Sequence, residues 1–207
     1  MSVKLTSQEL AKKYDRFAHW YDWVEGIPDL LGVRKLRRQI IARASGKVLE
    51  VAVGTGKNLP YYPSGNGITA IDVSRAMMDV ARKRAARLPR DVSFLLADAE
   101  ALPFSDKTFD TLVSSLTTCT FPNPVIALHE MARVCKPTGR ILLLEHGRSD
   151  REWFGRWQDR RSDRHAKPLG CHWNREPLKL VREADLKVVA ARHTFFGIFH
   201  EIEARPN

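Results

Sequence analysis

Apolar residues recur through the early part of the chain at the spacing of an α-helix. Over residues 6–25 they return every three or four positions, which predicts an amphipathic helix whose apolar stripe is Leu10, Tyr14, Phe17, Tyr21 and Val24. Thr6 and Glu9 have the spacing of a capping box at its first turn. A second helix is predicted over about residues 29–44, ending at Ser45-Gly46. Its expected inward residues are Val33, Leu36, Ile40, Ile41 and Ala44, and its expected outward residues are Arg34, Lys35, Arg37 and Arg38.

From Lys47 onward, short apolar runs typical of buried strands alternate with helical segments. The predicted strands cover about residues 47–53, 68–72, 92–96, 110–114 and 140–145, followed by two closing strands over 186–192 and 195–204. Helices are expected after Ser74, from Asn123-Pro124 to about Cys135, and over 175–184. Repeated strand–helix units predict a parallel sheet with helices on both faces. The short connection between the last two strands predicts that they pair antiparallel.

The pattern predicts one α/β domain with a seven-stranded, mostly parallel sheet whose last strand is antiparallel. A chain of 207 residues is long enough to bury one full core. Residues 1–45 are expected to form a helical cap over the binding edge of a core formed by residues 46–207. No apolar run approaches the roughly 18 residues of a membrane span, and charged residues interrupt any signal-peptide core near the N-terminus. The expected compartment is therefore the cytoplasm.

Charge is the unusual feature of the composition. The chain carries a formal net charge of +10, which suits an anionic partner such as an acidic membrane surface and equally suits a solvated basic surface. Between residues 149 and 173, arginines alternate with Trp153, Phe154 and Trp157. That mixture is typical of a membrane interface, but it also fits a substrate lid or a solvated helix whose rings pack on the domain. The three cysteines, Cys119, Cys135 and Cys171, have no zinc-ligand spacing, so no metal site is predicted.

A glycine loop follows the first predicted strand, over Glu50-Val-Ala-Val-Gly-Thr-Gly56, and Asp72 ends the second strand. Glycines let the backbone turn tightly beside a ligand, and a carboxylate at that strand end can accept both hydroxyls of a ribose. A dinucleotide site expects a third glycine where this chain has Leu59. NAD is therefore disfavoured, and a phosphate-binding P-loop is excluded because its motif is absent from the sequence.

Together these features resemble the class I methyltransferases, which have a Rossmann-like fold, and specifically the branch with the ubiquinone/menaquinone C-methyltransferases. The matching segments are Glu50–Gly56, Asp72, Asp98–Phe104, Phe109-Asp110 and Met131–Gly139. The resemblance implies S-adenosylmethionine as the cofactor. Ala52 departs from the family pattern, which has glycine there. A methyl group at that position narrows the space beside the cofactor.

The resemblance also implies roles for individual residues. Glu50 would orient the glycine loop near the methionine end, Asp72 would hold the ribose, and Asp98 with Ala99 would meet the adenine. Tyr14 and Tyr21 belong to an N-terminal helix that covers the methionine carboxylate in relatives. The remaining expected cofactor contacts are Ala52, Gly54, Gly56, Asn58, Val73, Met77 and Ser115. Plain core packing is the alternative for Met77 and the two tyrosines.

The acceptor is expected to be small or lipid-like. The chain has no Pro-Cys pair for cytosine methylation, and Ser114–Thr117 stands where amino-methylating nucleic-acid enzymes have their motif, so no nucleic acid is expected. Glu145-His146, Gly170–Glu176 and Cys119 look like the branch with the alkyl-thiol S-methyltransferases. Leu59–Pro63 is similar to bacterial phospholipid N-methyltransferases. The expected order is a thiol first, a phospholipid amine second and a quinone third.

His146 is the expected catalytic base, because it follows the fifth strand and ligands of open α/β sheets lie beyond the carboxyl ends of the strands. A thiol or an ammonium needs a base, and histidine titrates in the useful range. Glu145 could orient the ring, and His172 is the reserve candidate. A purely structural role at the strand end is the alternative for His146. A non-catalytic cofactor-binding protein is the alternative for the whole chain.

Overall fold

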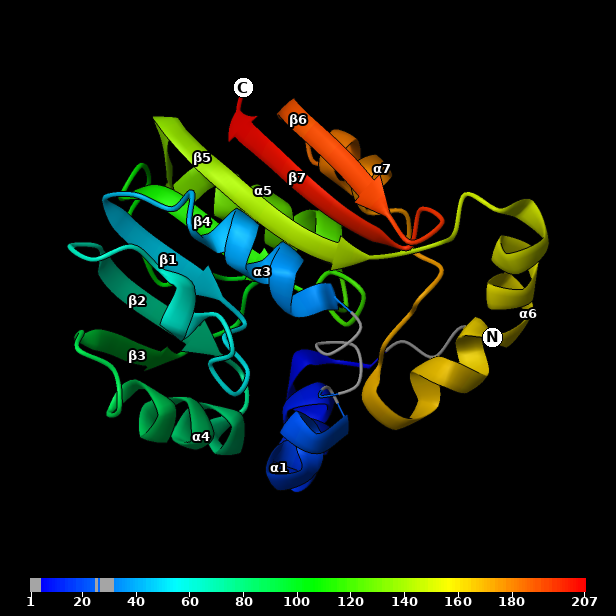
Figure 1. The fold of residues 1–207 in the computed structure, drawn as a ribbon, viewed down its shortest axis with the longest axis horizontal. Helices are drawn as coiled ribbons and strands as arrows, with labels where there is room; N and C mark the ends of the chain where they lie inside the picture. The colour runs from blue at the N-terminus through cyan, green and yellow to red at the C-terminus, as the bar shows by residue number, and fades with distance from the viewer. Residues whose placement is uncertain (1–4, 25, 27–31) are drawn as a thin grey trace.

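A single seven-stranded sheet organises the molecule (Figure 1). The computed structural model describes residues 5–24, 26 and 32–207. The strand order is β3-β2-β1-β4-β5-β7-β6, and all pairs are parallel except those made by β7. The strands are β1 (Lys47–Val51), β2 (Gly67–Asp72), β3 (Val92–Leu96), β4 (Phe109–Ser115), β5 (Cys135–His146), β6 (Leu186–Thr194) and β7 (Phe199–Pro206). The predicted mostly parallel α/β sheet with an antiparallel last strand is confirmed.

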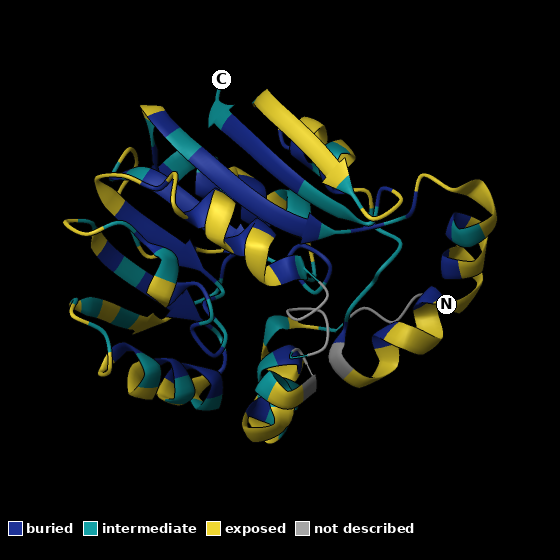
Figure 2. Cartoon of the chain, viewed as in Figure 1, coloured by how far each residue is buried: buried dark blue, intermediate teal, exposed yellow. Residues whose placement is uncertain are grey.

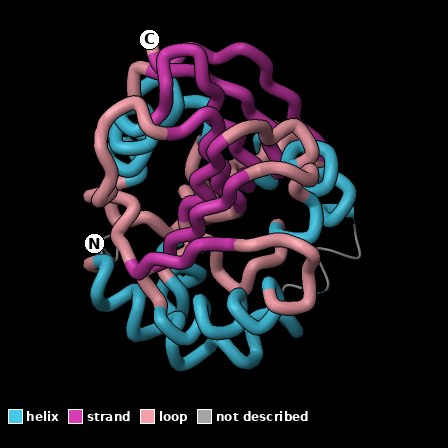
Figure 3. Tube along the Cα trace, turned by 90° about the vertical axis from the view of Figure 1, so that its left-hand side faces the viewer, coloured by secondary structure: helices cyan, strands magenta, loops and turns pink. Residues whose placement is uncertain are grey.

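Helices cover both faces of the sheet (Figure 3). On one face α3 (Arg34–Ile41) and α4 (Arg75–Ala85) pack with Val48 and Leu142. On the other face α5 (Pro124–Val134) and α7 (Pro177–Glu183) pack around Leu49 and Leu143. Figure 2 shows that the central strands are buried along most of their length, while β6 at the edge is largely exposed. The central strands are thus closely packed on both faces where they meet the pocket described below.

Several elements differ from their predicted bounds, among them the last strand, which was predicted over residues 195–204 and is β7 over Phe199–Pro206. The predicted helix over residues 29–44 appears as α3 over Arg34–Ile41, and residues 29–31 lie outside the described residues. The predicted strand at 140–145 is the longer β5, which begins at Cys135 directly after α5. The basic, aromatic stretch is a helix, α6 (Glu152–Leu169), which ends at Gly170 in the left-handed conformation with φ of 72°. No described helix is long and apolar enough to cross a bilayer.

The prediction that Arg37 faces outward is wrong. Its side chain is only 4% exposed, whereas its neighbours Arg34, Lys35 and Arg38 are exposed as expected. Helical periodicity puts Arg37 next to the inward Leu36, and a polar partner below the helix makes its burial favourable. That partner is Asn58, and both residues belong to the site described next.

Helix α1 (Ser7–Val24) lies beyond the carboxyl ends of β1 and β2 (Figure 1). Two aspartates on α1 hold it there. Asp15 Oδ1 accepts hydrogen bonds from Ser74 Oγ at 2.6 Å and from the Ala76 amide at 3.0 Å. Asp22 accepts from Thr55 Oγ1 at 2.6 Å and pairs with Arg84 at 2.5 Å. Helix α1 therefore forms a roof over the glycine loop and the start of α4.

Candidate functional site

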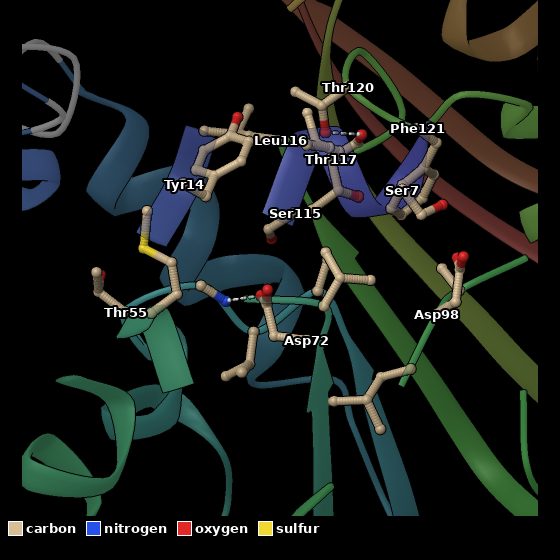
Figure 4. A pocket seen from close by; sticks show the side chains of 18 of the residues that line it. Ser7, Tyr14, Thr55, Asp72, Asp98, Ser115, Leu116, Thr117, Thr120 and Phe121 are labelled. Atoms are coloured by element: carbon tan, nitrogen blue, oxygen red, sulfur yellow. Dashed lines mark hydrogen bonds between the residues drawn. The ribbon is translucent and has the colours of Figure 1, made fainter. Parts of the chain in front are cut away.

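A pocket of about 900 Å³, part of it open to solvent, lies between the roof helix α1 and the carboxyl ends of β1, β2 and β4. This is the edge at which open α/β sheets bind ligands. Figure 4 shows Asp72 near the middle, with Thr55 toward one end, Asp98 toward the other, and Tyr14 of α1 facing it. Eleven of the predicted cofactor contacts line it: Tyr14, Tyr21, Ala52, Gly54, Asn58, Asp72, Val73, Met77, Asp98, Ala99 and Ser115.

The glycine loop after β1 has the conformation that its sequence predicts. Gly54 and Gly56 have φ of 54° and 79°, in the left-handed region that glycine adopts without strain. A side-chain carbon on Gly54 would meet nothing within 4 Å, so this face of the loop is open to a ligand. A carbon on Gly56 would approach Leu59 and Ala81 to 2.8 and 3.1 Å, so Gly56 allows close packing on α4 and does not border the pocket.

Ala52 also has a positive φ, at 55°. Left-handed backbone costs an alanine roughly 1–2 kcal/mol. This strain gives a physical reason why glycine is the expected residue at that position. Its methyl group borders the pocket, as predicted from the sequence.

Asp72 is buried at the end of β2 and is held by backbone donors. Its two carboxylate oxygens accept from the amides of Gly54 and Ser74, each at 2.8 Å. Burial raises the pKa of Asp72 from 3.8 to about 6, and these backbone hydrogen bonds oppose the rise. Each carboxylate oxygen keeps further lone pairs for a ligand. Asp72 is therefore a fixed acceptor for hydroxyl groups in the middle of the pocket.

A buried polar chain runs from the pocket wall to β1. Arg37 Nη1 donates to Asn58 Oδ1 at 2.8 Å, and Asn58 Nδ2 donates to Glu50 Oε1 at 2.8 Å. Arg37 and Asn58 border the pocket, whereas Glu50 stands behind them. Burial raises the pKa of Glu50 from 4.5 to about 7, although Asn58 and Arg37 oppose the rise. Glu50 thus fixes the orientation of Asn58, which in turn positions the guanidinium of Arg37.

The opposite wall comes from α1 and from the loop after β4. The rings of Tyr14 and Tyr21 lie 6.0 Å apart, edge to face. Burial raises the pKa of Tyr14 well above its usual value, and the neighbouring Tyr21, Cys119 and Cys171 raise it further. Ser115 Oγ is buried and has no hydrogen-bond partner among the described residues. An unsatisfied hydroxyl of this kind has a cost that a bound polar ligand can remove.

The two histidines predicted to be catalytic lie beside this wall and do not border the pocket itself. His146 is the last residue of β5, and its Nε2 lies 3.4 Å from Cys171 Sγ. His172 follows that cysteine, and its backbone amide donates to the Cys119 carbonyl at 2.9 Å. The pKa of the Cys171 thiol is lowered, because Cys119 donates a hydrogen bond to it and His146 lies beside it. We call Cys119, His146 and Cys171 the Cys–His cluster.

Sequence reasoning missed the functional placement of Arg37, Asp15 and Asp22. The aspartates follow Tyr14 and Tyr21 directly, and that repeated Tyr-Asp pair was the available signal. Nothing local marked the burial of Arg37, because its partner Asn58 lies in the loop after β1. The members of the Cys–His cluster were each noted in the sequence, but their meeting had no local signal, since they come from three separate segments.

The chain is similar to known methyltransferases in sequence. A family model described as a methyltransferase domain matches residues 49–143. Methyltransferase OMS1, mitochondrial, of Saccharomyces cerevisiae is 31% identical, over 92% of this chain and 43% of its own length. A demethylmenaquinone methyltransferase of Renibacterium salmoninarum is 34% identical, over 70% of this chain and 61% of its own. A phosphatidylethanolamine N-methyltransferase of Cereibacter sphaeroides is 35% identical, over 69% of this chain and 70% of its own.

The fold is shared with solved structures of low sequence identity. The 4+2 cyclase SpnF superposes with a TM-score of 0.76 at 19% identity, covering 99% of this chain and 97% of that one. A SAM-dependent methyltransferase from Aquifex aeolicus has a TM-score of 0.62 at 20% identity, covering 83% of this chain and 87% of that one. The chain spans less than two thirds of the length of the first two curated relatives above.

Proposed function

This chain belongs to the S-adenosylmethionine-dependent methyltransferases, and on that premise we propose that it transfers the methyl group of its cofactor to a small, lipid-like acceptor. The observation that carries the proposal is the pocket at the carboxyl edge of the sheet, with the fixed carboxylate of Asp72 at its centre. When bound, the cofactor supplies an activated methyl group on a sulfonium. Transfer of a labelled methyl group to candidate lipids tests the proposal.

The residues of the pocket fit this cofactor. The open face of Gly54 leaves room for a ligand against the backbone, and the unsatisfied Ser115 Oγ is a polar group in need of a partner. We assign Asp72 to the ribose hydroxyls, and Asp98 with Ala99 to the adenine. Met77 is buried and borders the pocket, so it can pack on the adenine while belonging to the core. Glu50 would not contact the cofactor directly but would orient Asn58, which lines the pocket.

Arg37 is the residue proposed to hold the carboxylate of the cofactor's methionine end. Arg37 lines the pocket, as do Asn58, Lys57 and Gly54 from the glycine loop. One of its nitrogens is engaged by Asn58, which fixes the direction of the planar group. Arginine has a planar fork of donors whose geometry matches a carboxylate.

The Arg37→Met variant is expected to weaken binding of S-adenosylhomocysteine by roughly 10- to 100-fold, because a charge-assisted hydrogen bond contributes about 1.5–3 kcal/mol. Affinity for 5′-methylthioadenosine, which lacks the carboxylate, should change far less. Calorimetry with both ligands separates the two effects. Arg38→Met, on the exposed side of the same helix, is the matched control. Equal loss of both ligands in Arg37→Met would mean that Arg37 only supports the fold.

The lipid-like class of acceptor is supported by the relatives. Two of the three described above are named for a menaquinone precursor and for phosphatidylethanolamine, the name of OMS1 gives no acceptor, and none is named for a thiol. The order expected from the sequence therefore changes, with the phospholipid amine and the quinone ahead of the thiol. The pocket lining is rich in apolar groups beyond Ser115, including Leu116, Phe121 and Pro122. Such a lining suits the apolar body of an acceptor.

We propose that the acceptor is activated through His146 and its surroundings, with His172 as the reserve candidate. An ammonium must lose a proton before its nitrogen can attack the methyl group, and the same holds for a phenol that reacts at carbon. Nε2 of His146 faces Cys171 and does not face the pocket. His146 would therefore assist removal of the acceptor's proton indirectly, through the Cys–His cluster, which lies beside the pocket residue Tyr14. The neighbouring Glu145 is buried and accepts from the amides of Thr117 and Thr118, which fixes the loop of Cys119.

Exposed aromatic rings support docking on a membrane. Trp20 and Trp23 on α1, Trp153 on α6 and Phe196 in the β6–β7 turn are each at least 66% exposed. Helix α6 extends away from the sheet, and its outer surface is exposed (Figure 2). It carries the arginines that were noted in the sequence, and Arg161 lies 5.4 Å from the ring centre of Trp157. Rings and arginines together are typical of a surface that meets anionic headgroups.

The protein is expected to sediment with vesicles of anionic phospholipid at low salt and to be released at high salt, because the Debye length falls to about 3 Å at 1 M. Trp153→Ala should reduce the bound fraction, whereas Val189→Ala, an exposed apolar site on the edge strand β6, should not. Vesicle sedimentation over a salt series measures both. Equal binding to neutral and anionic vesicles would remove the electrostatic part of this proposal.

A further inference from the structure

Three side chains with metal-binding atoms meet beside the pocket wall. Cys119 lies in the loop after β4, His146 ends β5, and Cys171 follows α6. Their two sulfurs and a ring nitrogen of the histidine all lie within 4.8 Å of one another. The Cys171 Sγ to His146 Nε2 distance is 3.4 Å. Cys119 is buried, and the other two residues are partly buried.

This arrangement matches the ligand set of a transition metal. In a tetrahedral zinc site with Zn–S near 2.3 Å and Zn–N near 2.0 Å, neighbouring ligand atoms are roughly 3.5–3.8 Å apart. Two thiolates and an imidazole suit zinc better than they suit magnesium or calcium, which prefer oxygen. We propose that Cys119, His146 and Cys171 bind one zinc ion, with water as its fourth ligand. The absence of zinc-ligand spacing in the sequence does not oppose this, because the ligands come from distant segments.

The segments that carry the three ligands are tied together by other contacts. Arg175 Nη1 donates to the carbonyl oxygens of Thr118 and Phe121, on either side of Cys119. The His172 amide donates to the Cys119 carbonyl, which joins the loop of Cys171 to the loop of Cys119. Glu145, next to His146, accepts from the amides of Thr117 and Thr118. The ligands are thereby held close before a metal arrives, which lowers the entropic cost of binding it.

The proposed zinc site adjoins the acceptor side of the pocket. Leu116, Thr117 and Thr120, which flank Cys119 in sequence, line the pocket, as does Tyr14. An ion held by the cluster would therefore stand directly behind this wall. Zinc binding is measured without an acceptor, so a chain that binds no zinc could still transfer a methyl group. A chain that transfers no methyl group could likewise still bind zinc, so the two proposals can fail separately.

The test is metal binding by the full chain, purified with a reductant and stripped with a chelator. Addition of zinc should restore about one ion per chain, and cobalt in its place should give the thiolate-to-metal charge-transfer absorption of a cysteine-ligated site. Zinc affinity should fall by more than about 100-fold in each of Cys171→Ser, Cys119→Ser and His146→Ala, since loss of a group that only hydrogen-bonds to a metal ligand already costs about 10- to 100-fold. Cys135→Ser, which alters the buried cysteine at the start of β5, should retain it.

Two outcomes would overturn the proposal. One is that the reduced wild-type chain binds neither zinc nor cobalt. That result counts against the proposal even if mass spectrometry finds that Cys119 and Cys171 form a disulfide before the reductant is added. The other is that Cys135→Ser loses the metal as fully as Cys171→Ser does. If one ligand variant fails to fold, the other two and the cobalt spectrum of the wild type decide the question.

Discussion

Replacement of Asp72 by alanine is expected to weaken binding of S-adenosylmethionine and S-adenosylhomocysteine by roughly 100-fold or more. Two charge-assisted hydrogen bonds to the ribose would be lost, each contributing about 1.5–3 kcal/mol. The amides of Gly54 and Ser74 would also lose their acceptor, so the glycine loop would be less well fixed. Calorimetry with both ligands measures the effect. Asp79→Ala, at an exposed position on α4, is the control and should bind normally.

The same carboxylate predicts how binding depends on pH. Burial raises the pKa of Asp72 in the ligand-free protein to about 6, and hydroxyl donors favour the ionised form. Affinity should be constant well above pH 6 and should fall as the pH drops below 6, because the carboxyl becomes protonated. Asp72→Asn keeps one acceptor oxygen but has no such titration, so its weaker binding should not change over this range. A wild-type profile that is flat from pH 5 to 8 would contradict the role assigned to Asp72.

Replacement of His146 by alanine is expected to lower turnover by about 10²- to 10⁴-fold, which is the usual range for loss of acid–base assistance. Cofactor affinity should stay near that of the wild type, because His146 does not border the pocket. Steady-state kinetics together with calorimetry give both quantities. The expected pattern is a fall in kcat without a change in cofactor binding.

Variants of the Cys–His cluster identify how His146 acts. If it works through the cluster, Cys171→Ser should lose turnover to a similar extent, since Cys171 Sγ lies 3.4 Å from His146 Nε2. Cys135→Ser should keep wild-type turnover. Wild-type turnover in His146→Ala would remove the residue from the mechanism. Loss of cofactor binding in that variant would make its role structural.

Local signals account for the parts of the fold that the sequence predicted well. Ser74 caps α4, with its Oγ accepting from the Met77 amide at 3.1 Å, and Pro124 stands in the first turn of α5. The apolar run at Val92–Leu96 matched β3 residue for residue. The glycine loop and Asp72 were predictable because a tight turn and a strand-end carboxylate each depend on the residue type at that position.

Long-range contacts account for what the sequence did not reveal. Arg37 is buried because Asn58 and Glu50 provide a polar path beneath α3, and these residues are remote from it in sequence. Residue polarity alone predicts an outward arginine. The Cys–His cluster likewise exists only because β4, β5 and the segment after α6 meet at one edge. The spacing of residues along the chain cannot predict a contact between segments that are so far apart in sequence.

The proposed methyl transfer to a lipid-like acceptor is tested most directly by following a labelled methyl group from S-adenosylmethionine. Phosphatidylethanolamine, a demethylated quinone and an alkyl thiol would be offered separately to the full chain, with Asp72→Ala as the blank. We expect label in a lipid-like acceptor, at a rate that depends on Asp72. Tight cofactor binding without label in any of the three acceptors would contradict this expectation and would favour a protein that binds the cofactor without methylating these classes.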